Sequence, residues 1–240
     1  MAIVISAVLV GLFVAGMQLV ENETARRVFQ LLGGNMPGGI IQFLSFMIFF
    51  WGFFEINDRS RRLKVERNSI QMGLLPEKEH WVLSPTDVND LKLKMINAEK
   101  EEKTLLTSVI KKACTKFRAN NSISDVIDVV TNQIKINSNK AEGGQSIIRF
   151  LAWALPSVGF IGTIMGIAQA LGLADKASDP AVLGQITDAM YVAFDTTLVA
   201  LLLNIFLMWF YHNLQETEDE LHSDMEEYVM ENLVNRIHLE

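Results

Sequence analysis

The sequence predicts an all-α integral membrane protein: four transmembrane helices, a helical cytoplasmic domain and long cytoplasmic helix extensions. Of the 240 residues, 50% are hydrophobic and 20% are charged. These values are compatible only if apolar and charged residues are segregated along the chain. They are, because charged segments separate four apolar runs, 3–20, 39–56, 147–173 and 186–211. A membrane-spanning helix needs about 20 apolar residues, so we interpret each run as a span, although the second is somewhat short.

The first run occupies the position of a secretory signal peptide. It lacks a basic segment before the apolar stretch and a usual cleavage site, although Ala7, Ala15 and Gly16 are scattered in it. We therefore expect an uncleaved span. At the other end, Leu239-Glu240 resembles a cloning scar, which leaves open whether the natural chain extends past Glu240.

The distribution of Lys and Arg predicts the orientation in the membrane. Residues 57–146 contain sixteen of them, whereas residues 21–38 contain two and residues 174–185 contain one. Basic residues accumulate in cytoplasmic connections. The sequence therefore predicts that 57–146 is cytoplasmic, that the two short connections face outward and that both termini are cytoplasmic.

This orientation divides the chain into four segments. Residues 1–56 are predicted to form two peripheral spans with an outer loop, 57–146 a cytoplasmic helical domain, 147–211 a pair of membrane helices, and 212–240 an acidic helical tail. In the outer loop, the Gly33–Gly39 stretch predicts a turn. The second span is aromatic and apolar all round, which favours a helix that faces lipid.

The cytoplasmic segment has helical signals. Ser84-Pro85-Thr86-Asp87 is a helix start, apolar residues recur at helical spacing from Leu91 to Phe117, and Ser122 or Ser124 can cap a further helix. We interpret it as a bundle that joins the second and third spans, with a docking surface for a cytoplasmic effector as the alternative. The tail carries nine acidic residues, so we expect it to pack against this basic segment.

The third and fourth spans carry small and hydroxyl residues where a simple anchor would carry Leu and Val. In the third span, Gly159, Gly162, Thr163 and Gly166 recur at three- and four-residue spacing, which lets membrane helices approach closely. Pro156 is expected to kink this helix.

In the fourth span, Ala193, Thr197, Ala200 and Asn204 share one helical face. Thr163 and Thr197 lie ten and eleven residues from the outer ends of their runs. At about 1.5 Å per residue both are about 15–17 Å deep, near the middle of a hydrocarbon core of about 30 Å. Two hydroxyls at one depth favour a lined pathway over threonines that only bond their own helix backbone.

Asp195 lies on a different face from Thr197, together with Asp188 and Tyr191. A carboxylate at this depth is costly unless it is paired, protonated or hydrated. We expect no Lys or Arg partner within the spans. Asp195 is therefore predicted to be neutral and hydrogen-bonded at a helix interface, or exposed to a second polar cavity, with a direct role in ion binding as a further possibility.

The run from Pro156 to Ile167 resembles the Pro-x-x-Gly-x-x-Gly-Thr-x-x-Gly segment of the MotA/TolQ/ExbB superfamily. The run from Ala193 to Leu201 resembles its second signature, with Thr197 at the Thr position and Ala200 at the usual Gly. The resemblance covers residues 147–211. The four-span plan with a large cytoplasmic loop is similar to the A-type subunits of flagellar stators.

The resemblance implies a homopentamer in the bacterial inner membrane around a dimeric single-span partner, of the MotB, TolR or ExbD kind, whose membrane Asp accepts the ion. Residues 147–211 would line the pore, and passage of H⁺ or Na⁺ would drive rotation. No cofactor beyond the transported ion is expected, and no nucleic-acid partner. The ion-pathway residues would be Thr163, Thr197, Thr196, Asn204 and Asp195, and the packing or pore-lining residues Pro156, Gly159, Gly162, Gly166, Ala193 and Ala200.

Two other classes were weighed. A non-conducting scaffold or receptor would use the small residues for helix packing alone, and would not need two hydroxyls at one depth. An intramembrane enzyme is disfavoured, because the spans contain no catalytic pair of side chains. The histidines His80, His212, His222 and His238 lie outside the spans, and we expect them to be solvated rather than metal ligands.

Overall fold

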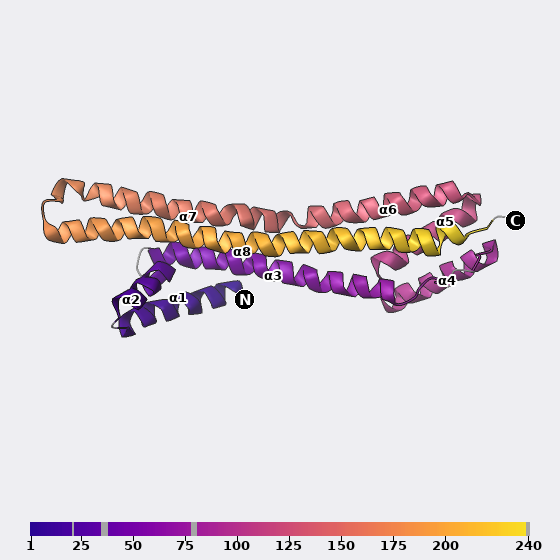
Figure 1. The fold of residues 1–240 in the computed structure, drawn as a ribbon, viewed down its shortest axis with the longest axis horizontal. Helices are drawn as coiled ribbons and strands as arrows, with labels where there is room; N and C mark the ends of the chain where they lie inside the picture. Colours follow the sequence, from indigo (N-terminus) through magenta and orange to yellow (C-terminus); the bar gives the residue numbers. More distant parts are fainter. Residues whose placement is uncertain (21, 35–37, 78–80, 239–240) are drawn as a thin grey trace. The chain divides into compact units, whose positions relative to one another are not determined.

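The computed structural model describes residues 1–240 except 21, 35–37, 78–80 and 239–240 (Figure 1). Its helical elements in chain order are α1 (Ala2–Leu19), α2 (Glu23–Phe29), η1 (Gln30–Gly34), α3 (Gly38–Gln71), α4 (Pro85–Glu101), α5 (Leu105–Asn120), α6 (Ile123–Gly144), α7 (Ser146–Gly172), η2 (Ala174–Lys176), α8 (Pro180–Asn232) and η3 (Val234–Arg236). The described residues contain no β-strand, apart from one isolated bridge between Leu83 and Ile237. The predicted all-α fold class is confirmed.

Four stretches of helix are long and apolar enough to cross a membrane: Ala2–Leu19, Gly38–Gln71, Ile123–Gly172 and Pro180–Arg236. Each contains, to within a residue or two, one of the apolar runs that the sequence predicts as spans. The chain is therefore a multi-pass membrane protein. Leu239-Glu240, the suspected scar, lies outside the described residues.

The chain packs into two compact units. The first comprises Met1–Asn57 and Ser146–His212, and the second comprises Asp58–Gln145 and Asn213–Glu240. The long helices α3 and α8 contribute residues to both, so each unit combines segments that are distant in the sequence.

In the first unit, α3 buries one face against α8. A Cβ atom on Gly52 would lie 2.8 Å from a methyl carbon of Leu207, and the rings of Phe53 and Phe210 meet edge to face at 5.2 Å. Trp51, in contrast, is 49% exposed. The second span, predicted to face lipid, thus has an exposed side and a second face that meets α8, where Gly52 leaves room for a leucine side chain.

In the outer loop, the glycine stretch predicted as a turn lies partly in helices, because Gly34 ends η1 and Gly38 begins α3. Gly33 has a φ of +115°, a conformation that side chains disfavour. Residues 35–37, the middle of the predicted turn, lie outside the described residues. Further along, α7 continues through Pro156, and Ser157 Oγ donates a hydrogen bond to the carbonyl of Trp153 at 3.0 Å.

In the second unit, the helix starts follow the predicted caps. Ser84 and Asp87 form a capping box at the start of α4, and Ser122 Oγ accepts from the backbone N–H of Asp125 at the start of α6. The single helix suggested by the spacing between Leu91 and Phe117 is wrong. The helix ends after Glu101 and restarts at Leu105, because Thr104 caps the backbone of a separate helix, α5.

The acidic tail packs against the segment 58–145, as predicted, but mostly through apolar and backbone contacts. Fully buried side chains of this unit include Met95, Leu106, Ile110, Phe117, Leu221, Met225 and Leu233. Leu83 donates its N–H to the carbonyl of Arg236 at 2.7 Å, and His238 donates to Leu83 at 3.1 Å. The ion pair between Arg67 and Glu220 is long, at 3.9 Å, and exposed, so charge attraction contributes little to this packing.

One histidine differs from the prediction. His222 is buried, with 6% of its surface exposed, and its Nδ1 lies 2.7 Å from the carbonyl of Glu218 one turn earlier in α8. Nδ1 must donate this bond, since a carbonyl only accepts. His212 and His238 are exposed, and His80 lies outside the described residues.

The core of the second unit gives a direct test of its packing. Replacing Leu106, which is completely buried in α5, by alanine removes buried methyl groups and leaves a cavity. We expect Leu106→Ala to destabilise the protein by about 2–5 kcal/mol, measured by thermal or denaturant unfolding in detergent. Leu93→Ala is the matched control, because Leu93 is 51% exposed; equal effects of the two substitutions would contradict the packing.

Candidate functional site

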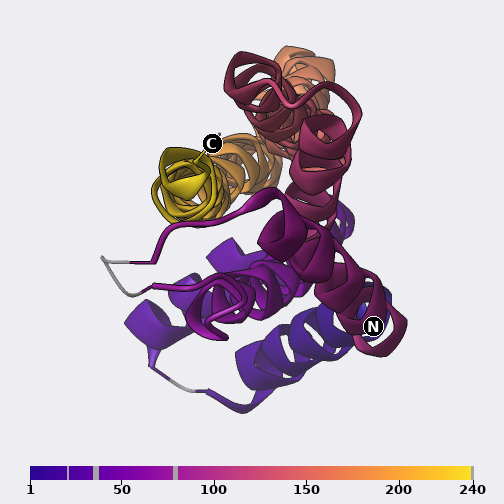
Figure 2. The same cartoon turned by 90° about the vertical axis from the view of Figure 1, so that its right-hand side faces the viewer.

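The glycines of α7 bring its backbone against α8. In both views the two helices lie side by side (Figures 1 and 2). A Cβ atom on Gly159 would lie 2.5 Å from that of Ala200, and one on Gly166 would lie 2.5 Å from the carbonyl oxygen of Ala189. One on Gly162 would overlap the side chain of Thr196. No side chain fits at these three positions, so the two backbones approach as closely as small residues allow.

This approach brings the hydroxyls of Thr163 and Thr197 into contact. The two Oγ1 atoms lie within hydrogen-bond distance of each other. Thr163 Oγ1 lies 3.1 Å from the carbonyl of Ala193 on α8, and Thr197 Oγ1 lies 3.0 Å from the carbonyl of Gly159 on α7. Each hydroxyl thus reaches a backbone carbonyl of the opposite helix, and four oxygen atoms gather at one level.

The hydroxyl protons are too few for these contacts. Thr163 and Thr197 bring one O–H each, whereas their contacts with each other and with the two carbonyls are four. If both protons pointed at carbonyls, two hydroxyl oxygens would face each other without a proton between them. One hydroxyl must therefore donate to the other, so only one of their two protons remains for the two carbonyls. Such an oxygen cluster suits a proton or a small hard cation.

Two further predicted pathway residues lie on α8, Thr196 beside this level and Asn204 about two helical turns further along. Thr196 is fully buried, and its hydroxyl lies 2.9 Å from the carbonyl of Val192, its own helix backbone. This is the local bond that a threonine in a membrane helix commonly makes. Asn204 is half-buried, and its Oδ1 is buried without a hydrogen-bond partner among the described residues. Thr196 Oγ1 also lies 3.4 Å from the carbonyl of Gly159 on α7, a longer contact than that of Thr197 with the same carbonyl.

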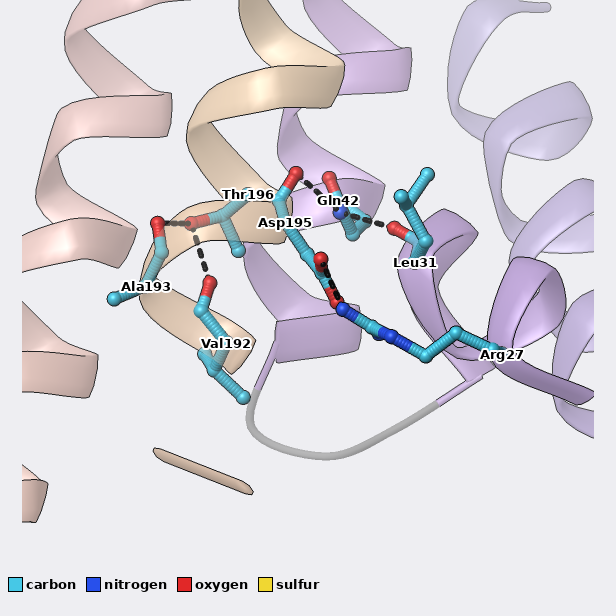
Figure 3. A network of polar contacts seen from close by, with 7 residues as sticks. All are labelled: Arg27, Leu31, Gln42, Val192, Ala193, Asp195 and Thr196. Carbon is cyan, nitrogen blue, oxygen red and sulfur yellow. Dashed lines mark hydrogen bonds and ion pairs between the residues drawn. The ribbon is translucent and has the colours of Figure 1, made fainter. Parts of the chain in front are cut away.

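Asp195 points away from the hydroxyls and is paired (Figure 3). Arg27 of α2 donates two hydrogen bonds to its carboxylate, at 2.6 and 2.7 Å. The sequence analysis expected a neutral Asp195 at a helix interface or one exposed to a second polar cavity, and it missed this partner, since Arg27 reaches Asp195 from the outer connection. Only 7% of the Asp195 surface is exposed, whereas the Arg27 side chain keeps 35% of its surface exposed. The contact is bidentate, the geometry in which Arg–carboxylate contacts are strongest.

Two more side chains complete this second cluster. The Arg27 guanidinium lies over the ring of Tyr191, 4.1 Å from its centre, a favourable cation–π contact. Gln42 of α3 donates to the carbonyl of Leu31 at 2.6 Å and lies 3.4 Å from the backbone carbonyl of Asp195. Residues of α2, η1 and α3 thus converge on one face of α8 (Figure 3).

Arg27 and Gln42 are the residues that the sequence analysis missed. Arg27 counted only as an outward charge, and Gln42, 99% buried as the structure shows, passed as part of an apolar run. The signal that could have found Arg27 is charge balance: Asp195 needs a cation, and the outer connection between the first two spans holds only Arg26 and Arg27. Nothing in the local pattern selects Arg27 over Arg26.

Comparison with known proteins identifies the family. The MotA/TolQ/ExbB proton channel family matches residues 98–227, more than half of the chain. The chain therefore belongs to this family. The match extends well beyond residues 147–211, on which the sequence resemblance rests, and includes parts of both units. No curated protein and no solved structure matches the chain.

In the part of the chain that the structure describes, no group of three or more His, Cys, Asp or Glu side chains is placed to hold a metal ion.

The helix approach can be tested at Gly162. We expect Gly162→Ala to destabilise the protein by about 1–3 kcal/mol, because the added methyl group would overlap Thr196 in a packed interface. Gly184→Ala is the control, since a Cβ atom there meets nothing within 4 Å. The measurement is thermal unfolding in detergent; a Gly162→Ala protein as stable as the control would rule out the close contact.

Proposed function

We propose that this protein is the A-type subunit of an ion-driven energy-transducing motor. Five copies form a ring around a dimer of single-span partner helices, and passage of H⁺ or Na⁺ turns the ring around the partner. Membership of a proton channel family supports ion transport as the general activity. The observation that carries the specific proposal is the contact between the Thr163 and Thr197 hydroxyls and two carbonyls at one level of the helix pair.

The role of this oxygen cluster follows from its chemistry. It offers oxygen atoms and exchangeable protons but no negative charge of its own, because Asp195 faces elsewhere and is neutralised by Arg27. A partner helix that supplies a carboxylate would complete a site that can hold and release an ion. In this arrangement Thr163 and Thr197 face the partner's Asp, while Thr196 and Asn204 contribute further polar atoms along α8.

The remaining segments take supporting roles in the proposal. Residues 1–56 form peripheral helices around the pore pair 147–211. The segment 57–146 and the tail 212–240 lie in the cytoplasm, where an effector can bind the former. The basic character of 57–146 supports a bacterial inner-membrane protein with both termini inside the cell.

The alternative is a scaffold without ion flux, in which the glycines of α7 serve helix packing alone. The hydroxyl cluster distinguishes the two functions. Packing requires small side chains, and valine is nearly isosteric with threonine, so a scaffold would tolerate a Thr-to-Val replacement at the cluster. An ion pathway would not.

We therefore predict that Thr163→Val or Thr197→Val lowers ion flux by roughly tenfold or more, which corresponds to about 1.4 kcal/mol of lost ion stabilisation. Flux is measured in proteoliposomes that contain the complex with its partner, under H⁺ and Na⁺ gradients. Thr187→Val is the matched control, because Thr187 is exposed on the same helix and bonds only the carbonyl of Leu183. Full flux in both cluster variants would leave the scaffold as the better account.

The proposed assembly has its own test. Electron microscopy of the detergent-solubilised protein should show particles with five-fold symmetry, and the Thr163→Val protein should show the same particles because the helix packing is kept. A stable monomer in mild detergent, found by mass photometry or light scattering, would speak against a pentameric motor.

A further inference from the structure

The level of α8 that carries Thr197 is held from two opposite sides. Thr197 faces α7, while Asp195, two residues earlier, points to the other side, because two residues of an α-helix rotate by about 200°. We propose that Arg27 is a positioning residue for the ion pathway: by holding Asp195, it sets the rotation of α8 that keeps the Thr197 hydroxyl against Thr163. This inference rests on the proposed function.

The geometry of the ion pair fits a positioning role. Both carboxylate oxygens of Asp195 accept from the two terminal nitrogens of Arg27, at 2.6 and 2.7 Å. A planar fork bound at two points fixes direction as well as distance. Because Asp195 is 7% exposed, losing Arg27 would leave an uncompensated buried charge, and α8 could regain solvation for it only by turning or shifting.

Neighbouring contacts hold the same rotation. Tyr191 lies one turn before Asp195 on the same face of α8, and its ring packs against the Arg27 guanidinium at 4.1 Å. Gln42 links the carbonyl of Leu31 to the backbone of Asp195 itself. The short outer helix α2 and the start of α3 thus hold α8 at the residue directly before Thr196 and Thr197 (Figure 3).

The same contacts argue against Asp195 as an ion ligand. Its negative charge is already balanced by a guanidinium that uses both oxygens. A passing cation would have to displace Arg27, whose charge is fixed at any physiological pH. In this proposal Asp195 therefore supports the pathway and is not itself one of the groups that bind the ion.

The test compares four variants in proteoliposomes that contain the complex with its partner: Arg27→Gln, Asp195→Asn, the exchange Arg27→Asp with Asp195→Arg, and the control Arg26→Gln. Flux is measured over a range of H⁺ or Na⁺ concentrations, which separates the half-saturating concentration from the maximal rate. Arg26 is the matched control, because it precedes Arg27 on α2 and is exposed.

We expect Arg27→Gln and Asp195→Asn each to raise the half-saturating ion concentration about tenfold, because the hydroxyls lose their alignment; tenfold corresponds to about 1.4 kcal/mol. The exchanged pair should return it to within about threefold of wild type, and Arg26→Gln should leave it unchanged. A simple loss of folded protein would lower only the maximal rate.

Three results would overturn the inference. The first is an unchanged half-saturating concentration in Arg27→Gln. The second is an exchanged pair that folds, assembles and stays as impaired as Asp195→Asn, which would make the carboxylate itself an ion ligand. If the exchanged pair does not assemble, the double variant Arg27→Gln with Asp195→Asn replaces it. The third result is then a shift in the half-saturating concentration of the double variant that equals the sum of the two single shifts, instead of matching one of them. A wild-type complex that conducts neither ion would instead contradict the proposed function as a whole.

Discussion

The close approach of α7 and α8 is the constraint on which the membrane unit depends. Three glycines on one face of α7 leave no side chain between the backbones, and Ala200 fits the space opposite Gly159. Only at this separation can the hydroxyl of Thr163 on one helix reach the carbonyl of Ala193 on the other. A bulkier residue in this face would have two effects. It would destabilise the packing of the two helices, and it would separate the oxygen atoms that the proposed pathway needs.

The peripheral N-terminal helices hold α8 from the side opposite to α7. A helix that is packed on one side alone can rotate about that contact, and the N-terminal elements supply the opposing contact through Arg27 and Gln42. The cost of desolvating an arginine and an aspartate is considerable, and such a pair is weak grounds for stability by itself. Its contribution here is to fix the rotation of α8, since a bidentate pair has one preferred geometry whereas apolar contacts with lipid or with another helix have many.

The sequence predicted those features of the protein that depend on local residue patterns. The apolar runs predicted the spans, and counting residues from their ends predicted that Thr163 and Thr197 share a depth, which the contact between their hydroxyls matches. It failed where a partner comes from far away: Arg27 and Asp195 are separated by 168 residues. It also failed where a cap overrides a periodic pattern, as at Thr104, because helical spacing continues across a break that the hydrogen bonds of one side chain decide.

The central claim is that the Thr163–Thr197 cluster faces the partner's carboxylate in an assembled pore. The most direct measurement is a high-resolution electron cryomicroscopy structure of the complex purified with its single-span partner. The account predicts the partner's membrane carboxylate within hydrogen-bond reach, directly or through one ion or water, of the cluster in at least one subunit of a five-fold ring. A cluster that faces lipid or a neighbouring subunit, with the partner carboxylate at another depth, would contradict it.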